Sequence, residues 1–89
     1  IIFMNINDLI AIVKKKLITK IVIEKIDIED KSFLHKNHSG HQEGKFHLKL
    51  IISSDELRKL NKIKSNKKIY KVLDEEMKEY IHSLQILIS

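Results

Sequence analysis

The chain has 89 residues, of which 43% are hydrophobic, and it contains no cysteine. That length suits one domain over residues 1–89, and the hydrophobic content argues against disorder along most of the chain. The absence of cysteine excludes disulfides and a self-contained thiolate metal site. The formal charge of +5 suits a nucleic-acid partner. However, only one of the 17 basic residues is arginine, and the abundance of lysine and isoleucine is equally typical of an AT-rich coding sequence.

We expect no targeting or membrane segment at the start of this sequence. Its apolar start, residues 1–4, is interrupted at once by Asn5, Asn7 and Asp8, so no run of ~20 apolar residues forms. We interpret residues 1–4 as a disordered or non-native extension, with Met4 as a candidate initiator. We therefore expect a protein of the cytoplasm or an organelle matrix, with no membrane partner.

The first half of the chain predicts one helix and two strands. Asn5 and Asp8 resemble a capping box, and apolar residues then recur at helical spacing as far as Leu17. Residues 21–28 are rich in Ile and Val and predict a strand, and residues 46–52 predict a second strand. The connection over residues 29–45 is long for so small a domain, and connections of this length are usually functional or disordered.

The second half predicts two helices and a last strand. Ser53 and Glu56 form a capping box for a short helix ending near Leu60. A longer helix is expected over residues 65–80, followed by a strand over residues 82–88. The order α-β-β-α-α-β predicts a two-layer α/β (α+β) fold. A right-handed crossover would make the second and third strands parallel, in a three-stranded mixed sheet with helices on one face.

Histidines are the main candidates for chemistry. His35, His38 and His41 lie in the long connection, His47 begins the second strand, and His82 begins the third. Neutral imidazole binds iron, zinc and copper well, although this spacing fits no standard zinc site. A solvated polar loop explains the three loop histidines equally well. His82 is expected on the face of Leu84, Ile86 and Ile88, where a half-buried histidine bonded to the backbone is the alternative to a ligand.

Catalytic patterns are absent from the sequence, so we do not expect an enzyme or a small-molecule substrate. There is no nucleophile elbow or phosphate-binding glycine run. The remaining candidate is a basic stretch that runs from Arg58 to Lys71 without an acid. Its candidate nucleic-acid contacts are Arg58, Lys62, Lys64, Lys67, Lys68 and Lys71.

Several segments together resemble the BolA-like proteins. They are Asp30-Lys31-Ser32, His35 with His38-Ser39-Gly40, Phe46-His47-Leu48, Ile51-Ile52-Ser53, Ile69-Tyr70-Lys71-Val72-Leu73, and Tyr80-Ile81-His82-Ser83-Leu84. They occur in the family's order and cover nearly the whole chain from Leu9 onward. The resemblance implies a fold similar to the type II KH domain.

The resemblance also implies a partner and a cofactor. BolA-like proteins form heterodimers with monothiol glutaredoxins that carry a Cys-Gly-Phe-Ser motif, and the pair shares a 2Fe–2S cluster with glutathione. The chain alone is not expected to hold the cluster stably. The family's near-invariant histidine ligand falls on His82. The second ligand comes from the loop, where counting from Ser32 favours His35 and counting back from His47 favours His38. His41 ranks behind both.

One segment departs from the family pattern. Ser65-Asn66-Lys67 stands where the family usually has Arg-His-Arg at the start of the third helix. Nucleic-acid contacts have been proposed on that helix for some members, so the departure weakens a DNA-binding role. Three hypotheses remain: cluster transfer, maturation or iron-linked regulation with a glutaredoxin, transcriptional regulation through nucleic-acid binding, and a stand-alone metal site made by the loop histidines. A role in the stress response is compatible with the first two.

Overall fold

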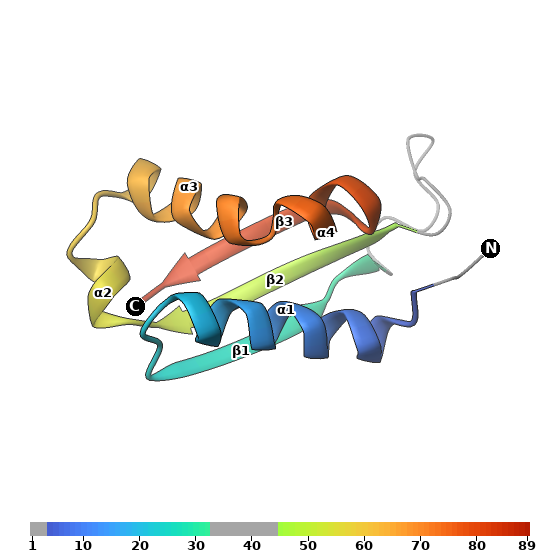
Figure 1. Cartoon of the computed structure of the whole chain (residues 1–89), viewed down its shortest axis with the longest axis horizontal. Helices are drawn as coiled ribbons and strands as arrows, with labels where there is room; N and C mark the ends of the chain where they lie inside the picture. The colour runs from blue at the N-terminus through green and yellow to red at the C-terminus, as the bar shows by residue number, and fades with distance from the viewer. Residues whose placement is uncertain (1–3, 33–44) are drawn as a thin grey trace.

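The computed structural model describes residues 4–32 and 45–89. Its elements are α1 (Ile6–Lys20), β1 (Lys25–Asp30), β2 (Phe46–Ser53), α2 (Asp55–Arg58), α3 (Lys62–Val72), α4 (Asp74–Glu79) and β3 (Ile81–Ile88). Figure 1 shows the three strands side by side, with α1 and α3 crossing the same face of the sheet in opposite directions. Among the described residues, no helix has the length and apolar character needed to span a bilayer.

The helix α1 begins as its sequence predicts. Asn5 is the N-cap, and its side chain accepts a hydrogen bond of 2.7 Å from the backbone N–H of Asn7. This contact satisfies one of the N–H groups that a helix start leaves without a partner. Leu9, Val13 and Leu17 are fully buried on one face. Their spacing of four residues is what places them there.

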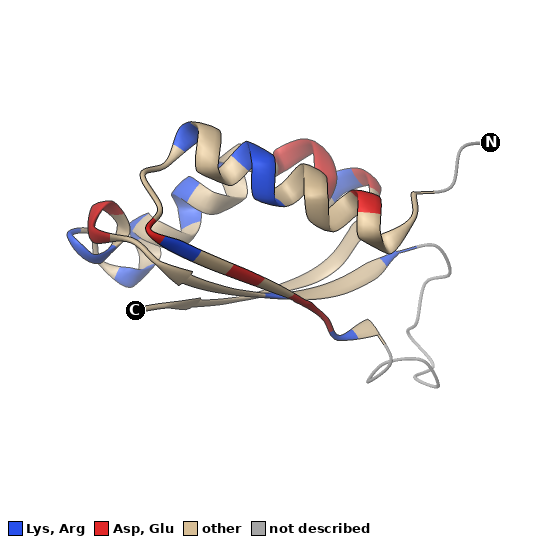
Figure 2. Ribbon diagram, turned by 90° about the horizontal axis from the view of Figure 1, so that it is seen from below, with Lys and Arg blue, Asp and Glu red and all other residues tan. Residues whose placement is uncertain are grey.

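The sheet has the order β1-β2-β3, with β1 antiparallel and β3 parallel to the central strand β2. The parallel pairing and the mixed sheet are as predicted. Figure 2 shows the long helices together on one side of the sheet, and no described helix crosses the other face. Leu48, Leu50 and Ile52 point from β2 into the core. The strand β1 begins at Lys25, later than predicted, because Ile21 is the C-cap of α1 and is itself buried in the core.

The predicted helix over residues 65–80 is wrong in two respects. It begins earlier, at Lys62, because the Asn61 side chain accepts a hydrogen bond of 2.8 Å from the N–H of Lys64. It is also divided, since Leu73 leaves helical geometry at φ −98° and ψ 18° between α3 and α4. The apolar period continues through the break, and Ile69 and Leu73 are both fully buried. A periodic pattern alone therefore could not reveal the division.

The capping-box pattern suggested Ser53 as the cap of α2, but the cap is Ser54. The hydroxyl of Ser54 accepts a hydrogen bond of 3.1 Å from Leu57 N–H and donates one of 2.7 Å to the carbonyl of Val22. Ser53 is instead the last residue of β2, and its hydroxyl lies 3.0 Å from that of Ser89. Ser54 is fully buried. It therefore joins α2 to the segment between α1 and β1.

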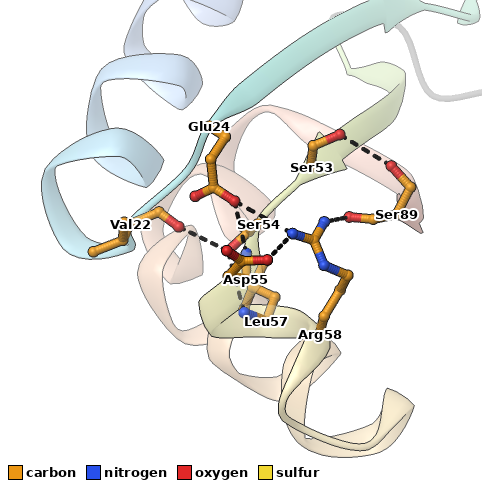
Figure 3. Close-up of polar contacts among 8 residues, drawn as sticks. All are labelled: Val22, Glu24, Ser53, Ser54, Asp55, Leu57, Arg58 and Ser89. Carbon is orange, nitrogen blue, oxygen red and sulfur yellow. Dashed lines mark hydrogen bonds and ion pairs between the residues drawn. The ribbon is translucent and has the colours of Figure 1, made fainter.

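A polar cluster around Arg58 surrounds this cap (Figure 3). The Arg58 guanidinium donates to the carboxylate of Asp55 and to the carbonyl of Ser89, and lies 3.4 Å from the carboxylate of Glu24. The Glu24 carboxylate also accepts a hydrogen bond of 2.8 Å from the N–H of Asp55. The cluster thus ties α2 to the start of β1 and to the end of β3.

We expect the carboxylates of Asp55 and Glu56 to contribute stability that is lost in acid. The Arg58 guanidinium lowers the pKa of Asp55, and a hydrogen bond from Lys68, with another from the Val22 N–H, lowers the pKa of Glu56. A carboxyl whose pKa is lower in the folded state stabilises the fold above its unfolded pKa, and this contribution disappears as the pH falls toward the folded pKa. The ordinary pKa values of these two carboxyls are 3.8 and 4.5. We therefore expect the melting temperature to decrease once the pH is lowered past about 4.5.

The measurement is a series of thermal melts from pH 2.5 to pH 7. The double variant Asp55→Asn with Glu56→Gln should melt lower than wild type at neutral pH and approach it in acid. Asp27→Asn removes an exposed carboxylate from β1 and serves as the control. The interpretation is wrong if the double variant and wild type lose stability in parallel over the whole range.

Candidate functional site

His82 lies at the start of β3, in an irregularity of the pairing with β2. Phe46 pairs with Ile81, but the next residue, His47, pairs with Ser83, so His82 is the extra residue of a β-bulge. Ile81 is buried, whereas His82 and Ser83 are both exposed. The prediction that His82 shares the face of Leu84 is therefore wrong. A bulge breaks the two-residue alternation of a strand, and here it leaves His82 on the side away from the core.

His47 packs against His82 from the neighbouring strand. The two imidazole rings meet edge to face, with centroids 4.9 Å apart and planes at 63°. The Nδ1 atom of His47 lies 2.6 Å from the hydroxyl of Ser83, within hydrogen-bond distance. His47 is only 5% exposed, so it has little freedom to move. The buried ring therefore supports the exposed one.

The proximity of His47 to His82 was not predicted as a feature of the site. A signal for it exists, because each histidine is the second residue of its strand and the two strands are parallel. Parallel neighbours begin at the same edge of a sheet, which brings their first residues together. This signal needs the pairing of β2 with β3, which periodicity alone does not specify.

The described residues on either side of residues 33–44 lie close to the start of β2 and are hydrogen-bonded there. The hydroxyl of Ser32 accepts a hydrogen bond of 3.1 Å from the N–H of His47, and the carbonyl of His47 accepts one of 2.7 Å from Lys31. On the other side, the N–H of Phe46 donates to the carbonyl of Tyr80 at 2.9 Å. The described chain on both sides of the connection is therefore fixed beside His47 and β3.

The predicted loop ligands His35, His38 and His41 lie outside the described residues. Within residues 4–32 and 45–89, no three metal-binding side chains come together. The described part of the site therefore offers two adjacent imidazoles, one exposed and one buried. Imidazole is a ligand for iron, zinc and copper. A complete metal site at this position would need additional ligands.

The basic residues between Arg58 and Lys71 fall into two groups. Arg58 pairs with Asp55 and Glu24, and Lys68 pairs with Glu56 at 2.7 Å. Five others are exposed and have no ion pair with a described residue: Lys59, Lys62, Lys64, Lys67 and Lys71. Only this second group offers positive charge that the fold itself does not compensate.

Comparison with known proteins agrees with the fold and with the order of these segments. The sequence pattern of the family described as BolA-like protein matches residues 17–89. The DNA-binding transcriptional regulator BolA of Haemophilus influenzae is 32% identical over 59 residues, covering 66% of this chain and 54% of that protein. The match thus spans about half the length of that relative.

Two solved plant structures are similar to this one over most of both chains. The BolA domain of SufE1 from Arabidopsis thaliana has a TM-score of 0.75 and 29% identity, and BolA1 from the same organism has 0.75 and 26%. Each comparison covers 89% of this chain and 87% of the other. Because the family pattern spans most of the sequence and includes both strands that carry His47 and His82, this chain belongs to the BolA-like family.

Proposed function

We propose that this BolA-like protein is a non-enzymatic partner of a monothiol glutaredoxin and contributes histidine ligands to a 2Fe–2S cluster shared between them. The observation that carries the proposal is the position of His82. Its ring is exposed on the side of the sheet away from the core, and the buried ring of His47 supports it at 4.9 Å. An exposed ligand with restricted motion suits a site that a second protein completes.

This chain would supply the imidazole ligands of such a cluster site but not the thiolate ligands. The chain has no cysteine, so both thiolates would come from the glutaredoxin and from its glutathione. His82 would supply one imidazole. His35 or His38 would supply the second, with His41 ranking behind them. Histidine ligation at one iron raises the reduction potential of a 2Fe–2S cluster.

The neighbours of His82 would position it and would not bind iron themselves. The ring of His47 packs against the ring of His82, and Ser83 lies within hydrogen-bond distance of His47. Partners that orient a ligand commonly affect metal affinity as well. The backbone N–H of His47 also donates a hydrogen bond to the hydroxyl of Ser32. Ser32 precedes the connection that carries the loop histidines. The proposed role places the protein in the cytosol or an organelle matrix, in cluster transfer, maturation or iron-linked regulation.

The direct test mixes this protein with a monothiol glutaredoxin, glutathione and reconstituted 2Fe–2S cluster, and records visible circular dichroism. We expect a new spectrum, distinct from that of the glutaredoxin homodimer, and a 1:1 heterodimer in native mass spectrometry. An unchanged spectrum without a heterodimer would contradict the proposal. Iron or zinc retained by the protein purified alone would instead support a stand-alone site made by its own histidines.

A second candidate function is DNA binding. It is favoured by the name of the Haemophilus influenzae relative and by the four exposed lysines of α3, Lys62, Lys64, Lys67 and Lys71. If this function holds, replacing Lys64 and Lys67 by glutamate should weaken duplex binding and reduce its dependence on salt. Arg58→Gln, which removes a cation already paired within the fold, should have a smaller effect. Absence of duplex binding at physiological salt would reject this candidate.

A further inference from the structure

A groove between α1 and α3 forms a second candidate site. It has a volume of about 700 Å³, and its surface is mostly apolar. Ile12 and Thr19 line it from α1, and Val72 lines it at the end of α3. Figure 1 shows these two helices on the same face of the sheet, running in opposite directions. The groove therefore belongs to the helical layer, whereas His82 lies on the opposite side of the sheet.

Lysines form the remainder of the groove. They are Lys15, Lys16 and Lys20 from α1 and Lys71 from α3, and no carboxylate lines it. Lys16 is already paired with Glu76 at 2.5 Å and with Glu75 at 3.4 Å, and the hydrogen bond that the Lys16 ammonium donates to Glu76 raises the pKa of Lys16. The carboxylates of Glu75 and Glu76 therefore already compensate the charge of Lys16.

The other three lysines have no such partner in the described chain. Lys15, Lys20 and Lys71 are exposed and form no ion pair with another described residue. They lie on both helices, so positive charge flanks the apolar surface from two sides. A matching ligand would present apolar groups along its centre and carboxylates along both edges.

We propose that this groove binds an acidic amphipathic helix of a partner protein. Two neighbouring helices form a groove that accepts the apolar side chains of a third, and recognition of this kind uses residues at spacings of three and four. Glutamates flanking that apolar stripe would reach Lys15 and Lys20 on one side and Lys71 on the other. A nucleic-acid backbone would satisfy the ammonium groups but would leave the apolar surface of Ile12 and Val72 without a matching group.

The test uses a labelled synthetic peptide of about 14 residues, long enough for four helical turns. Leucines occupy one face at spacings of three and four, and glutamates flank them. Fluorescence anisotropy measures affinity, and two-dimensional NMR of the intact protein locates the binding site. We expect saturable binding, with the largest shifts at Thr19, Lys71 and Val72, and helical circular dichroism of the bound peptide.

Charge reversal separates this site from general attraction to a basic protein. Lys15→Glu with Lys71→Glu should weaken binding about tenfold or more. Lys25→Glu with Lys59→Glu makes the same change in net charge at exposed positions outside the groove and should have little effect. Thr19→Trp, an uncharged substitution that fills the groove, should also block binding.

Several results with the peptide would overturn the inference. They are the absence of saturable binding, equal loss in both charge-reversed variants, equal affinity for a peptide with lysine in place of glutamate, and shifts that map outside the groove. Binding of vesicles containing anionic lipid through these residues, in place of the peptide, would identify a membrane surface and overturn the helix proposal. Self-association that buries the same residues would overturn it in favour of a second copy of this chain. None of these results affects the proposal for His82, which the cluster spectra test separately.

Discussion

His82→Ala is expected to abolish the visible circular dichroism of the mixed 2Fe–2S complex with a monothiol glutaredoxin. The substitution removes the one exposed imidazole that the described part of the chain presents beside His47. Because His82 lies in a bulge outside the core, the melting temperature of the protein alone should change little. Loss of the spectrum with an unchanged fold would therefore identify a ligand and not a structural residue.

Two control variants sharpen this measurement. Gln85→Ala alters an exposed residue farther along β3, and we expect it to leave the spectrum unchanged. His47→Phe keeps an aromatic ring against His82 but removes the Nδ1 contact with Ser83, so we expect a cluster of altered spectrum and shorter lifetime. The proposal fails if His82→Ala and Gln85→Ala give the same spectrum as wild type.

The second large effect expected is on stability, from Ser54→Ala. The Ser54 hydroxyl accepts a hydrogen bond from Leu57 and donates one to Val22, and the residue is fully buried. Its removal takes away a helix cap and leaves the Val22 carbonyl without that donor. Losing a helix cap together with a partly buried hydrogen bond costs about 1–3 kcal/mol. In a domain of this size, each kcal/mol lowers the melting temperature by roughly 4–8 °C.

Ser53→Ala is the matched control for this prediction. The Ser53 hydroxyl contacts that of Ser89 in an exposed position, and the expected change in the free energy of unfolding is within about 0.5 kcal/mol. Urea denaturation of both variants at neutral pH measures the difference. If Ser53→Ala were the more destabilising of the two, Ser53 would be the cap, as the sequence pattern suggested.

The neighbouring serines show where sequence reasoning is limited. Ser53 stands three residues before Glu56, which matches the pattern of a capping box. In the fold, Glu56 instead accepts from Lys68 and from the N–H of Val22, and Ser54 takes the cap. Both partners of Glu56, Lys68 and Val22, are distant from it in the sequence. A local pattern cannot anticipate them, because it compares only neighbours along the chain.

The histidines show the same limit at the candidate site. His82 was identified from its place at the start of the last strand and from the family resemblance. Its side of the sheet was predicted wrongly, because alternation along a strand does not reveal a bulge. The contact between His47 and His82 joins residues 35 positions apart, and only the pairing of β2 with β3 brings them together.

The sequence by itself determined the element types, the α1 cap at Asn5 and the apolar faces that form the core. These follow from propensities and periodicities that operate over a few residues. The tertiary structure alone decided the bulge at His82, the support from His47, the choice of Ser54 and the groove between α1 and α3. Each of these depends on contacts between distant segments, whose energies no local pattern contains.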